Sequence, residues 1–197
     1  MEYVPVVTVS MDRNGVNTKF NYNLKPGCLY LSRNPATIRC VVGTSVSVCL
    51  WDKQQRFGGM NHFIHPVIRD ADKATTRYGN VATAALVDMM LEQGSAYGHM
   101  VAQVTGGAVP ETNRSNDLGA RNVEAAREVL VRKGIAITSE DVGGTLGRKI
   151  LFHTDTGQLL TMKVHQLRDE DWISDECDAK ALPDTDGTTP RRARDNR

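Results

Sequence analysis

The chain has 197 residues, of which 40% are hydrophobic and 24% charged, and its formal net charge is +1. This balance disfavours a general nucleic-acid-binding protein, which usually carries a clear basic excess. No apolar run reaches the ~20 residues of a membrane span, and the N-terminal residues lack the basic segment and the cleavage site of a signal peptide. We therefore expect a cytoplasmic protein with no direct membrane insertion and no nucleic-acid partner.

The first half of the chain reads as strands separated by turns. Residues 4–11 predict a short strand, 12–27 a polar turn and loop, and 28–32 a second strand. Residues 37–51 are rich in Val and Thr and are interrupted by Gly43, which predicts a strand, a bend and a second strand. A further strand is expected at 57–64, after a polar turn.

Two helices are expected in the second half. The first spans 75–93 and is closed by Gly94, and the second spans about 120–133 and is closed by Gly134. Spacings of three and four residues predict the buried stripe of each helix. In the first helix this stripe is Tyr78, Val81, Ala82, Ala85, Leu86 and Met89, and in the second it is Val123, Ala126 and Leu130.

Four more strands are expected at 98–104, 135–139, 149–153 and 158–165, the last two as a hairpin. Strands and helices do not alternate strictly, so we predict an α+β fold in a single domain, with mostly antiparallel pairing in its sheets and two main helices. The domain is expected over residues 1–167. Residues 168–197, acidic and then basic, predict a disordered tail.

No metal site and no cofactor are expected. The four cysteines, at 28, 40, 49 and 177, lack C-x-x-C spacing, and the five histidines match no zinc motif. Glycines 143, 144 and 147 do not form a phosphate-binding loop, because the characteristic Gly-Lys-Ser/Thr ending is absent. Reduced thiols are the expectation for a chain without a secretory signal.

Ser45 and His62 are the candidates for nucleophilic chemistry. A hairpin joining 44–50 to 57–64 would bring His62 near a side chain of the first strand, and a base facing a hydroxyl is the minimum for such a reaction. The alternative is a buried histidine satisfied by a backbone carbonyl, and local sequence alone favours it.

Six segments carry a resemblance to a known family and occur in its order: GTSVSVCLWD at 43–52, GGMNHFIHP at 58–66, RYGNVATAALVDMML at 77–91, GGA at 106–108, LGARNVEAA at 118–126 and EDVGGTLGRKILFHTDTG at 140–157. The family is CheD, the chemoreceptor glutamine deamidases of bacterial chemotaxis. The resemblance implies hydrolysis of glutamine side chains on the cytoplasmic part of chemoreceptors, and a CheC-type phosphatase as a further partner. It also implies a Cys–His pair completed by Thr.

The sequence departs from the family pattern at two catalytic positions. Ser45 stands at the nucleophile position, and Arg39 stands where the threonine of the triad is expected, while His62 matches. Ser45 could reflect an engineered Cys→Ser change, a natural binding protein without activity, or a serine variant of low activity. Cys40 could replace the nucleophile only if the bend at Gly43 turned it toward the site, and Cys49 lies too far along the strand.

Two function hypotheses therefore remain open. The chain is either a deamidase using Ser45 and His62, or an adaptor that binds receptors or a CheC-type phosphatase without turnover. Thr44 and Asn61 are candidates for positioning the substrate or the oxyanion, with a turn-stabilising role as the alternative for Asn61. Three further motif residues receive structural roles: Arg121 and Asn122 are expected to organise a helix start, and Arg148 to pair with Glu140 or Asp141.

Overall fold

The computed structural model describes residues 20–109 and 117–165. The strand expected at 4–11 and the tail expected at 168–197 lie outside the described residues. The strands are β1 (Phe20–Asn23), β2 (Leu29–Ser32), β3 (Ala36–Val42), β4 (Val46–Asp52), β5 (Phe57–Asn61), β6 (Met100–Gly106), β7 (Ala136–Val142), β8 (Gly147–His153) and β9 (Leu159–Val164). The helices are α1 (Gly79–Glu92) and α2 (Leu118–Arg132), with short 3₁₀ turns at Ala71–Lys73 and Tyr97–His99.

The nine described strands form two sheets. One has the order β1-β3-β8-β9 and the other β2-β5-β4-β6-β7. Five of the seven strand pairs are antiparallel, whereas β1 pairs with β3 and β6 with β7 in parallel. The expected α+β fold with mostly antiparallel, mixed sheets is thus confirmed.

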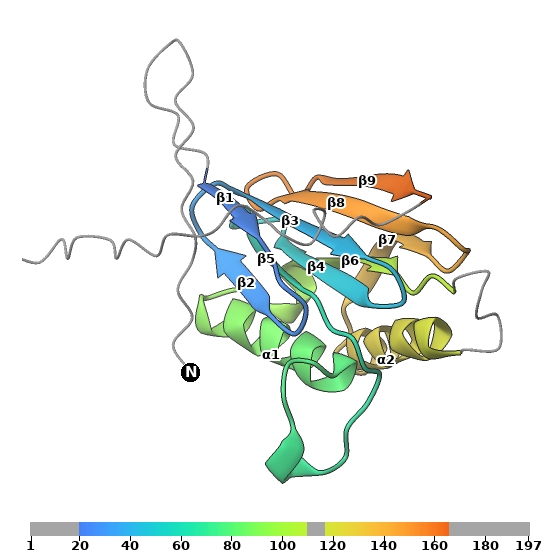
Figure 1. Ribbon diagram of the computed structural model, residues 1–197. Helices are drawn as coiled ribbons and strands as arrows, with labels where there is room; N and C mark the ends of the chain where they lie inside the picture. The colour runs from blue at the N-terminus through green and yellow to red at the C-terminus, as the bar shows by residue number, and fades with distance from the viewer. Residues whose placement is uncertain (1–19, 110–116, 166–197) are drawn as a thin grey trace, which may run out of the picture.

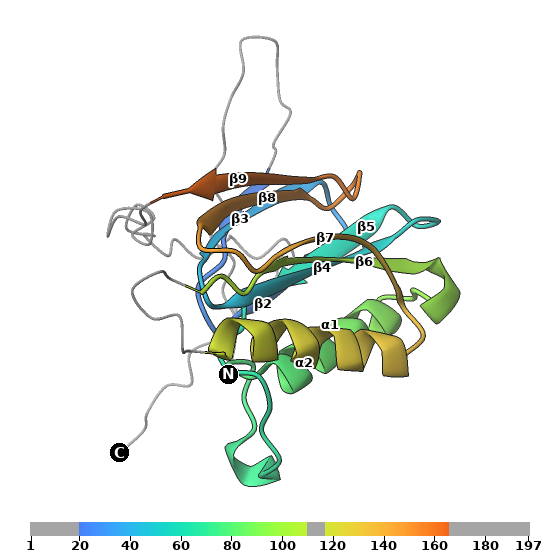
Figure 2. The same ribbon diagram turned by 90° about the vertical axis from the view of Figure 1, so that its right-hand side faces the viewer.

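The elements stack as three layers (Figure 2), with the four-stranded sheet on one side, the five-stranded sheet in the middle and both helices on its far face. Two apolar clusters fill the spaces between the layers. One includes Val48, Leu50, Leu86 and Leu130 and joins the middle sheet to the helices. The other includes Ile38, Met60 and Phe152 and joins the two sheets. Val48 and Leu50 of β4 face the first cluster, and Cys49 between them faces the second, because successive residues of a strand point to opposite sides.

Two sequence expectations are corrected here. Residues 20–23, assigned to a loop, form β1, which lies parallel to β3 with Phe20 opposite Ala36. Helix α1 begins at Gly79 rather than at residue 75, and its buried side chains are rotated relative to the predicted stripe. The helix is apolar on most of its surface, so spacing alone did not identify the buried face. The buried residues of α1 are Gly79, Ala82, Thr83, Leu86, Val87 and Met90.

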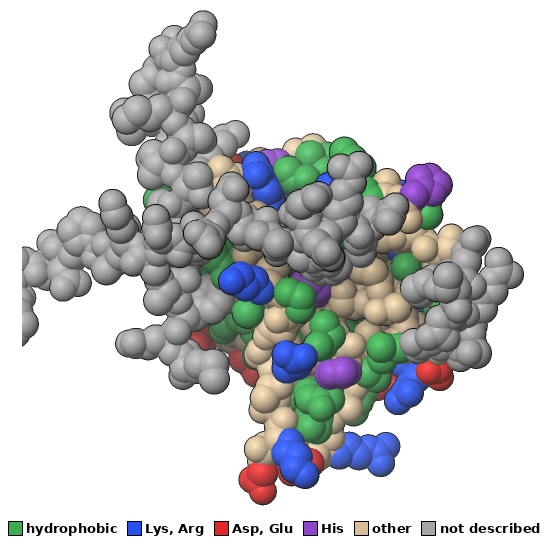
Figure 3. All heavy atoms as spheres, in the orientation of Figure 1, with side chains coloured by type: hydrophobic (Ala, Val, Ile, Leu, Met, Phe, Trp, Pro, Cys, Tyr) green, Lys and Arg blue, Asp and Glu red, His purple; other side chains and the backbone are tan. Residues whose placement is uncertain are grey.

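The connection between β5 and α1 projects away from the layers (Figure 1). Residues 69–75 of this projecting loop are exposed, and Lys73 pairs with Asp70 at 3.3 Å. Figure 3 shows acidic and basic side chains together at its tip. Main-chain hydrogen bonds join the two ends of the loop at its base, because Ile64 and His65 both donate to the carbonyl of Arg77.

Candidate active site

Ser45 lies in the bend where the chain crosses from one sheet to the other. Strand β3 ends at Val42, β4 begins at Val46, and residues 43–45 connect them. The end of β6 holds this bend: the N–H of Gly107 donates to the carbonyl of Ser45 at 2.9 Å, and the N–H of Ala108 donates to that of Gly43 at 2.8 Å. The bend predicted at Gly43 is therefore present, and its backbone is fixed on both sides of the serine.

His62 follows directly after β5 and is held by the segment that leads into β2. Its N–H donates to the carbonyl of Cys28 at 2.9 Å, and its own carbonyl accepts from Gly27 at 2.6 Å. The hydroxyl of Thr76, at the base of the projecting loop, donates to the carbonyl of Gly27. The segment before β2 thus fixes the main chain of His62, and Thr76 in turn holds that segment.

The side chains of Ser45 and His62 meet inside the protein. His62 Nε2 lies 2.9 Å from Ser45 Oγ, and the side chains are buried, with 0% of His62 and 7% of Ser45 exposed. The expectation that the β4–β5 hairpin brings these two side chains together is confirmed. With the proton of the neutral ring on Nδ1, the hydroxyl of Ser45 donates to Nε2, which is the arrangement a general base requires.

Burial controls the protonation of the histidine. It lowers the pKa of His62 to about 4, although the main chain of Leu24 favours the charged form. No well-aligned hydrogen bond forms between Nδ1 and another residue in the described part of the chain. His62 is therefore neutral at pH 7 and free to accept a proton at Nε2.

The main-chain N–H groups of Thr44 and Ser45 are the candidates for binding an oxyanion at the serine. Neither the N–H of Thr44 nor that of Ser45 donates to another residue within 20–109 or 117–165. Thr44 directly precedes Ser45 in the chain and is half-buried. Paired N–H groups of this kind can bind the oxyanion that forms during attack on an amide.

The structure places Asn61 away from the reacting groups. Its side chain is fully buried, Oδ1 accepts from the N–H of Val48 at 2.9 Å, and Nδ2 donates to Thr83 Oγ1 at 3.3 Å. The carboxamide thus joins β4 to α1 rather than stabilising a turn or facing Ser45. This geometry does not support the positioning role expected from the sequence.

The structure does not bring Arg39 to the pair. Its neighbours Ile38 and Cys40 face the core between the sheets, whereas the Arg39 side chain is exposed on the opposite face of β3. Its main-chain carbonyl accepts a hydrogen bond from the N–H of Leu24 at 2.7 Å. Arg39 therefore does not supply a third member of a triad.

Cys40 and Cys49 are poor substitutes for the nucleophile. Both are buried in the cluster between the sheets. Burial raises the pKa of Cys40 to about 12 and the pKa of Cys49 well above its usual value. A thiol attacks as its thiolate, so neither cysteine is reactive at neutral pH.

Two other motif residues are now placed. Arg148 is 2% exposed and donates to Asp141 Oδ1 at 2.9 Å, which confirms one of the two predicted pairings. Asn122 does not organise the start of α2 as expected; its Nδ2 donates to the carbonyls of Thr44 and Ile64 instead. Sequence spacing gave no signal for this contact, because the three residues are far apart along the chain.

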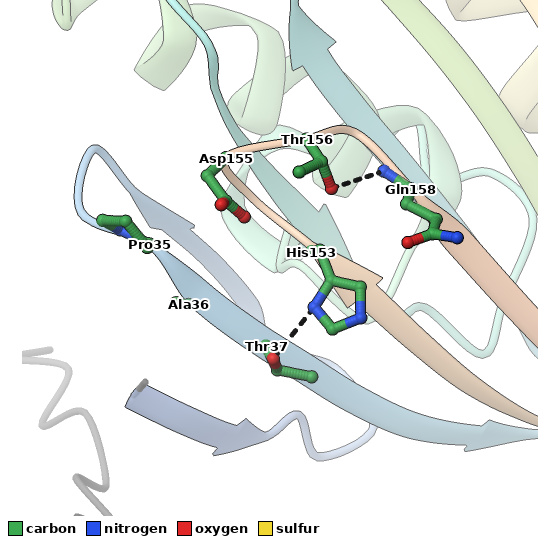
Figure 4. Close-up of a pocket in the computed structure, with 7 residues that line it drawn as sticks. All are labelled: Pro35, Ala36, Thr37, His153, Asp155, Thr156 and Gln158. Atoms are coloured by element: carbon green, nitrogen blue, oxygen red, sulfur yellow. Dashed lines mark hydrogen bonds between the residues drawn. The ribbon is translucent and has the colours of Figure 1, made fainter. Parts of the chain in front are cut away.

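A second hydroxyl–histidine pair lies at the other end of β3 (Figure 4). Thr37 Oγ1 is 3.0 Å from His153 Nδ1, at the edge of a pocket of about 140 Å³. Pro35, Asp155 and Gln158 also line this pocket. Strand β3 separates it from Ser45, so it is not part of the Ser45–His62 site.

Within the described ranges, no three His, Cys, Asp or Glu side chains gather in a way that could hold a metal ion. Among the described helices, none is long and apolar enough to cross a membrane.

Comparison with known proteins places this chain in a family. Residues 66–163 match the family model described as CheD chemotactic sensory transduction. A protein of Trichlorobacter lovleyi named probable chemoreceptor glutamine deamidase CheD is 38% identical over 141 residues, which cover 71% of this chain and 88% of that protein. The chain belongs to the CheD family.

Other CheD proteins are similar over comparable lengths. The protein of the same name from Rhodospirillum rubrum is 38% identical, over 72% of this chain and 81% of its own length. A CheD protein from Methanococcus maripaludis strain C6 is 31% identical, over 74% of this chain and 96% of its own length. The segment matched by the CheD family model begins downstream of both Ser45 and His62, so the roles of these two residues depend on the geometry described above.

Proposed function

We propose that the chain is an amide hydrolase that converts glutamine side chains of chemoreceptors to glutamate. The contact between Ser45 Oγ and His62 Nε2, at 2.9 Å, carries the proposal. The names of the CheD relatives, which describe chemoreceptor glutamine deamidases, supply the substrate class. The cytoplasmic part of a receptor would be the partner, and the cytoplasm the location.

The reaction follows from the geometry of the pair. Ser45 Oγ attacks the carboxamide carbon as its proton passes to His62 Nε2, and the N–H groups of Thr44 and Ser45 bind the oxyanion. The imidazolium then gives its proton to the departing nitrogen, which leaves as ammonia. Water, deprotonated by His62, attacks the resulting ester, and the products are glutamate and free Ser45.

Serine makes the first step demanding. A hydroxyl is a far weaker acid than a thiol, and burial lowers the pKa of His62 to about 4, so this histidine is a weak base. Replacement of Ser45 by cysteine should therefore raise the rate by several orders of magnitude if the rest of the site is intact, at ~1.4 kcal/mol for each tenfold change.

The weak base also favours a second candidate, an adaptor that binds a receptor or a CheC-type phosphatase without turnover. The two candidates differ in what His62 does. In the deamidase, His62→Ala abolishes product while binding persists. In the adaptor, binding survives the loss of Ser45 and His62, and neither the parent nor the His62→Ala variant forms product.

Mass spectrometry of a receptor cytoplasmic fragment tests the proposal, because conversion of glutamine to glutamate adds about one dalton. The parent, Ser45→Cys and His62→Ala would be incubated with the fragment. His153→Ala is the matched control, since His153 also contacts a hydroxyl but lies at the other end of β3. Conversion by the parent and by His153→Ala, lost in His62→Ala, supports the enzyme. No conversion by the parent or by Ser45→Cys contradicts it.

A further inference from the structure

Asn122 is a polar side chain in the apolar face of α2. It is fully buried, and its neighbours on that face are Val123, Ala126 and Val129. A buried carboxamide costs free energy unless its polar atoms are hydrogen-bonded. The hydrogen bonds of the Asn122 side chain should therefore explain why an amide occupies a position on the apolar face of α2.

The carboxamide bridges the two segments that carry the reacting side chains. Nδ2 donates to the carbonyl of Thr44 at 2.9 Å and to that of Ile64 at 3.2 Å. Thr44 directly precedes Ser45, and Ile64 comes two residues after His62. Between these points, Val46 and Phe63 exchange main-chain hydrogen bonds of 3.1 and 3.0 Å. Asn122 thus closes the end of the pairing that carries the site.

Close packing of the helix against β6 makes this reach possible. Gly107 has φ +68° and lies against Gly119 in the first turn of α2, where a Cβ atom on either residue would overlap the backbone of the other. The two glycines let α2 approach the end of β6, which itself holds Ser45 through the N–H of Gly107. One turn later along the helix, Asn122 meets the carbonyls of Thr44 and Ile64.

The carbonyl oxygen of the Asn122 side chain indicates that joining the two segments for stability does not fully account for this residue. Asn122 Oδ1 is buried and accepts no hydrogen bond from the described residues. An unpaired buried carbonyl lowers stability, so Asn122 makes the two hydrogen bonds of Nδ2 at the cost of leaving Oδ1 unsatisfied. Groups that cost stability are concentrated at functional sites.

We propose that Asn122 is a positioning residue, which sets the place of Ser45 relative to His62 by binding the carbonyls of Thr44 and Ile64. The inference rests on the proposed role of the Ser45–His62 pair. Each bond restrains one side of the pair, and the shared Nδ2 fixes the distance between them. Misplacement by about 1 Å of a reacting group can reduce a rate on the order of 100-fold.

Substitution of Asn122 tests the inference with two readouts. Asn122→Leu keeps a similar volume and removes both donors, and Asn122→Asp keeps the shape and, as a neutral acid, donates at most one bond. Ser95→Ala is the matched control: it also removes a buried donor, to Asp52 Oδ2, but at the other end of β4 from Ser45, about 20 Å along the strand. If Asn122→Leu does not fold, Asn122→Asp alone carries the test.

The first readout is turnover. We expect kcat to fall about 10- to 100-fold in Asn122→Leu and less in Asn122→Asp, with KM changed by less than about threefold. Ser95→Ala should keep the parent kcat at temperatures where it is folded. A kcat for Asn122→Leu, or for Asn122→Asp if only that variant folds, within twofold of that of Ser95→Ala would overturn the inference.

The second readout does not need turnover. The ¹⁵N NMR signal of His62 Nε2 reports its hydrogen bond to Ser45, and we expect it to shift in Asn122→Leu but not in Ser95→Ala. An unchanged signal in a folded Asn122 variant contradicts a positioning role. If the parent forms no glutamate but the signal moves as expected, the deamidase proposal fails and the positioning role stands.

Discussion

Gly106 lies so close to Ser45 that any side chain at this position would overlap the Ser45 carbonyl oxygen. Gly106 also has φ +119°, a conformation that residues with a Cβ atom rarely adopt. Gly106, the last residue of β6, therefore packs directly against the bend of residues 43–45. The site requires that this residue carry no side chain.

Gly106→Ala should displace the bend and destabilise the fold by more than about 3 kcal/mol, with loss of activity. Gly134→Ala is the control, because Gly134 also has positive φ but faces open space. It should cost about 1–2 kcal/mol and leave activity unchanged. Urea denaturation and the mass-spectrometric assay measure both effects. Equal losses in the two variants would show that backbone strain alone matters.

The buried imidazole should make stability depend on pH. The pKa of His62 is about 4 in the folded chain and 6.5 in the unfolded chain, so the unfolded state binds more protons between these values. The contribution of His62 to the free energy of unfolding is therefore fully present above pH 6.5. It is lost as the pH falls toward 4, by an amount on the order of 3 kcal/mol. Denaturation midpoints from pH 7.5 to 4.5 should show this loss in the parent and not in His62→Gln. Parallel curves for the two proteins would contradict it.

Restoring the family's threonine at position 39 should not activate the protein. The Arg39 side chain is exposed on the face of β3 that points away from the cluster between the sheets, so a threonine hydroxyl there would not reach His62. We expect Arg39→Thr to match the parent in the deamidation assay, alone and combined with Ser45→Cys. A tenfold gain from Arg39→Thr would show that β3 presents this position differently.

The ion pair between Arg148 and Asp141 should contribute far more than an exposed one. Arg148 also donates to the carbonyls of Gly143 and Leu146, so Asp141→Asn leaves a guanidinium buried without its counter-charge. Because Asp141 is 32% exposed, we expect a loss of about 2–4 kcal/mol, below the full cost of breaking a buried pair. Thermal or urea unfolding of the variant measures this loss.

Glu140→Gln is the matched control for Asp141→Asn. Glu140 accepts two hydrogen bonds from Arg127, at 2.9 and 3.0 Å, but this pair lies at the surface. Its loss should cost less than about 1 kcal/mol. A similar cost for both variants would mean that the buried position of Arg148 contributes nothing.

Thiol reactivity should separate the cysteines. Cys40 and Cys49 are buried, and burial raises the pKa of both. Burial also raises the pKa of Cys28, but this residue is only half-buried. With iodoacetamide at pH 8, peptide mapping should find Cys28 modified in the folded protein, and Cys40 and Cys49 modified only in denaturant. Fast labelling of Cys40 in the folded protein would reopen it as a nucleophile.

Local signals were sufficient for most elements and for the central pair. Gly43 marked the bend, and the glycines at 94 and 134 marked both helix ends. The expected hairpin of 44–50 and 57–64 made a contact between Ser45 and His62 possible, although local sequence alone favoured a structural role for the histidine. Strand β1 was missed because residues 20–23 alternate weakly and gain their pairing from β3, sixteen positions later. Such a parallel pairing leaves no pattern in either segment.

The roles of Asn122, Arg39 and Asn61 needed the three-dimensional arrangement. Asn122 contacts residues 78 and 58 positions away. Whether Arg39 faces the core or solvent depends on strand register, and a shift of one residue reverses the face. Asn61 lies next to His62 in sequence, yet its side chain points to the helix side because successive residues of a strand face opposite ways.

Because residues 43–45 connect two different sheets, the position of the nucleophile depends on the spacing between those sheets. That spacing is maintained by side chains such as Ile38, Met60 and Phe152, none of which is hydrogen-bonded to Ser45 or His62 through its side chain. Small volume changes in this layer would tilt one sheet against the other and move the serine relative to the imidazole. Activity can thus be tuned by apolar residues at a distance, so relatives with the same reacting groups can differ in rate through packing alone.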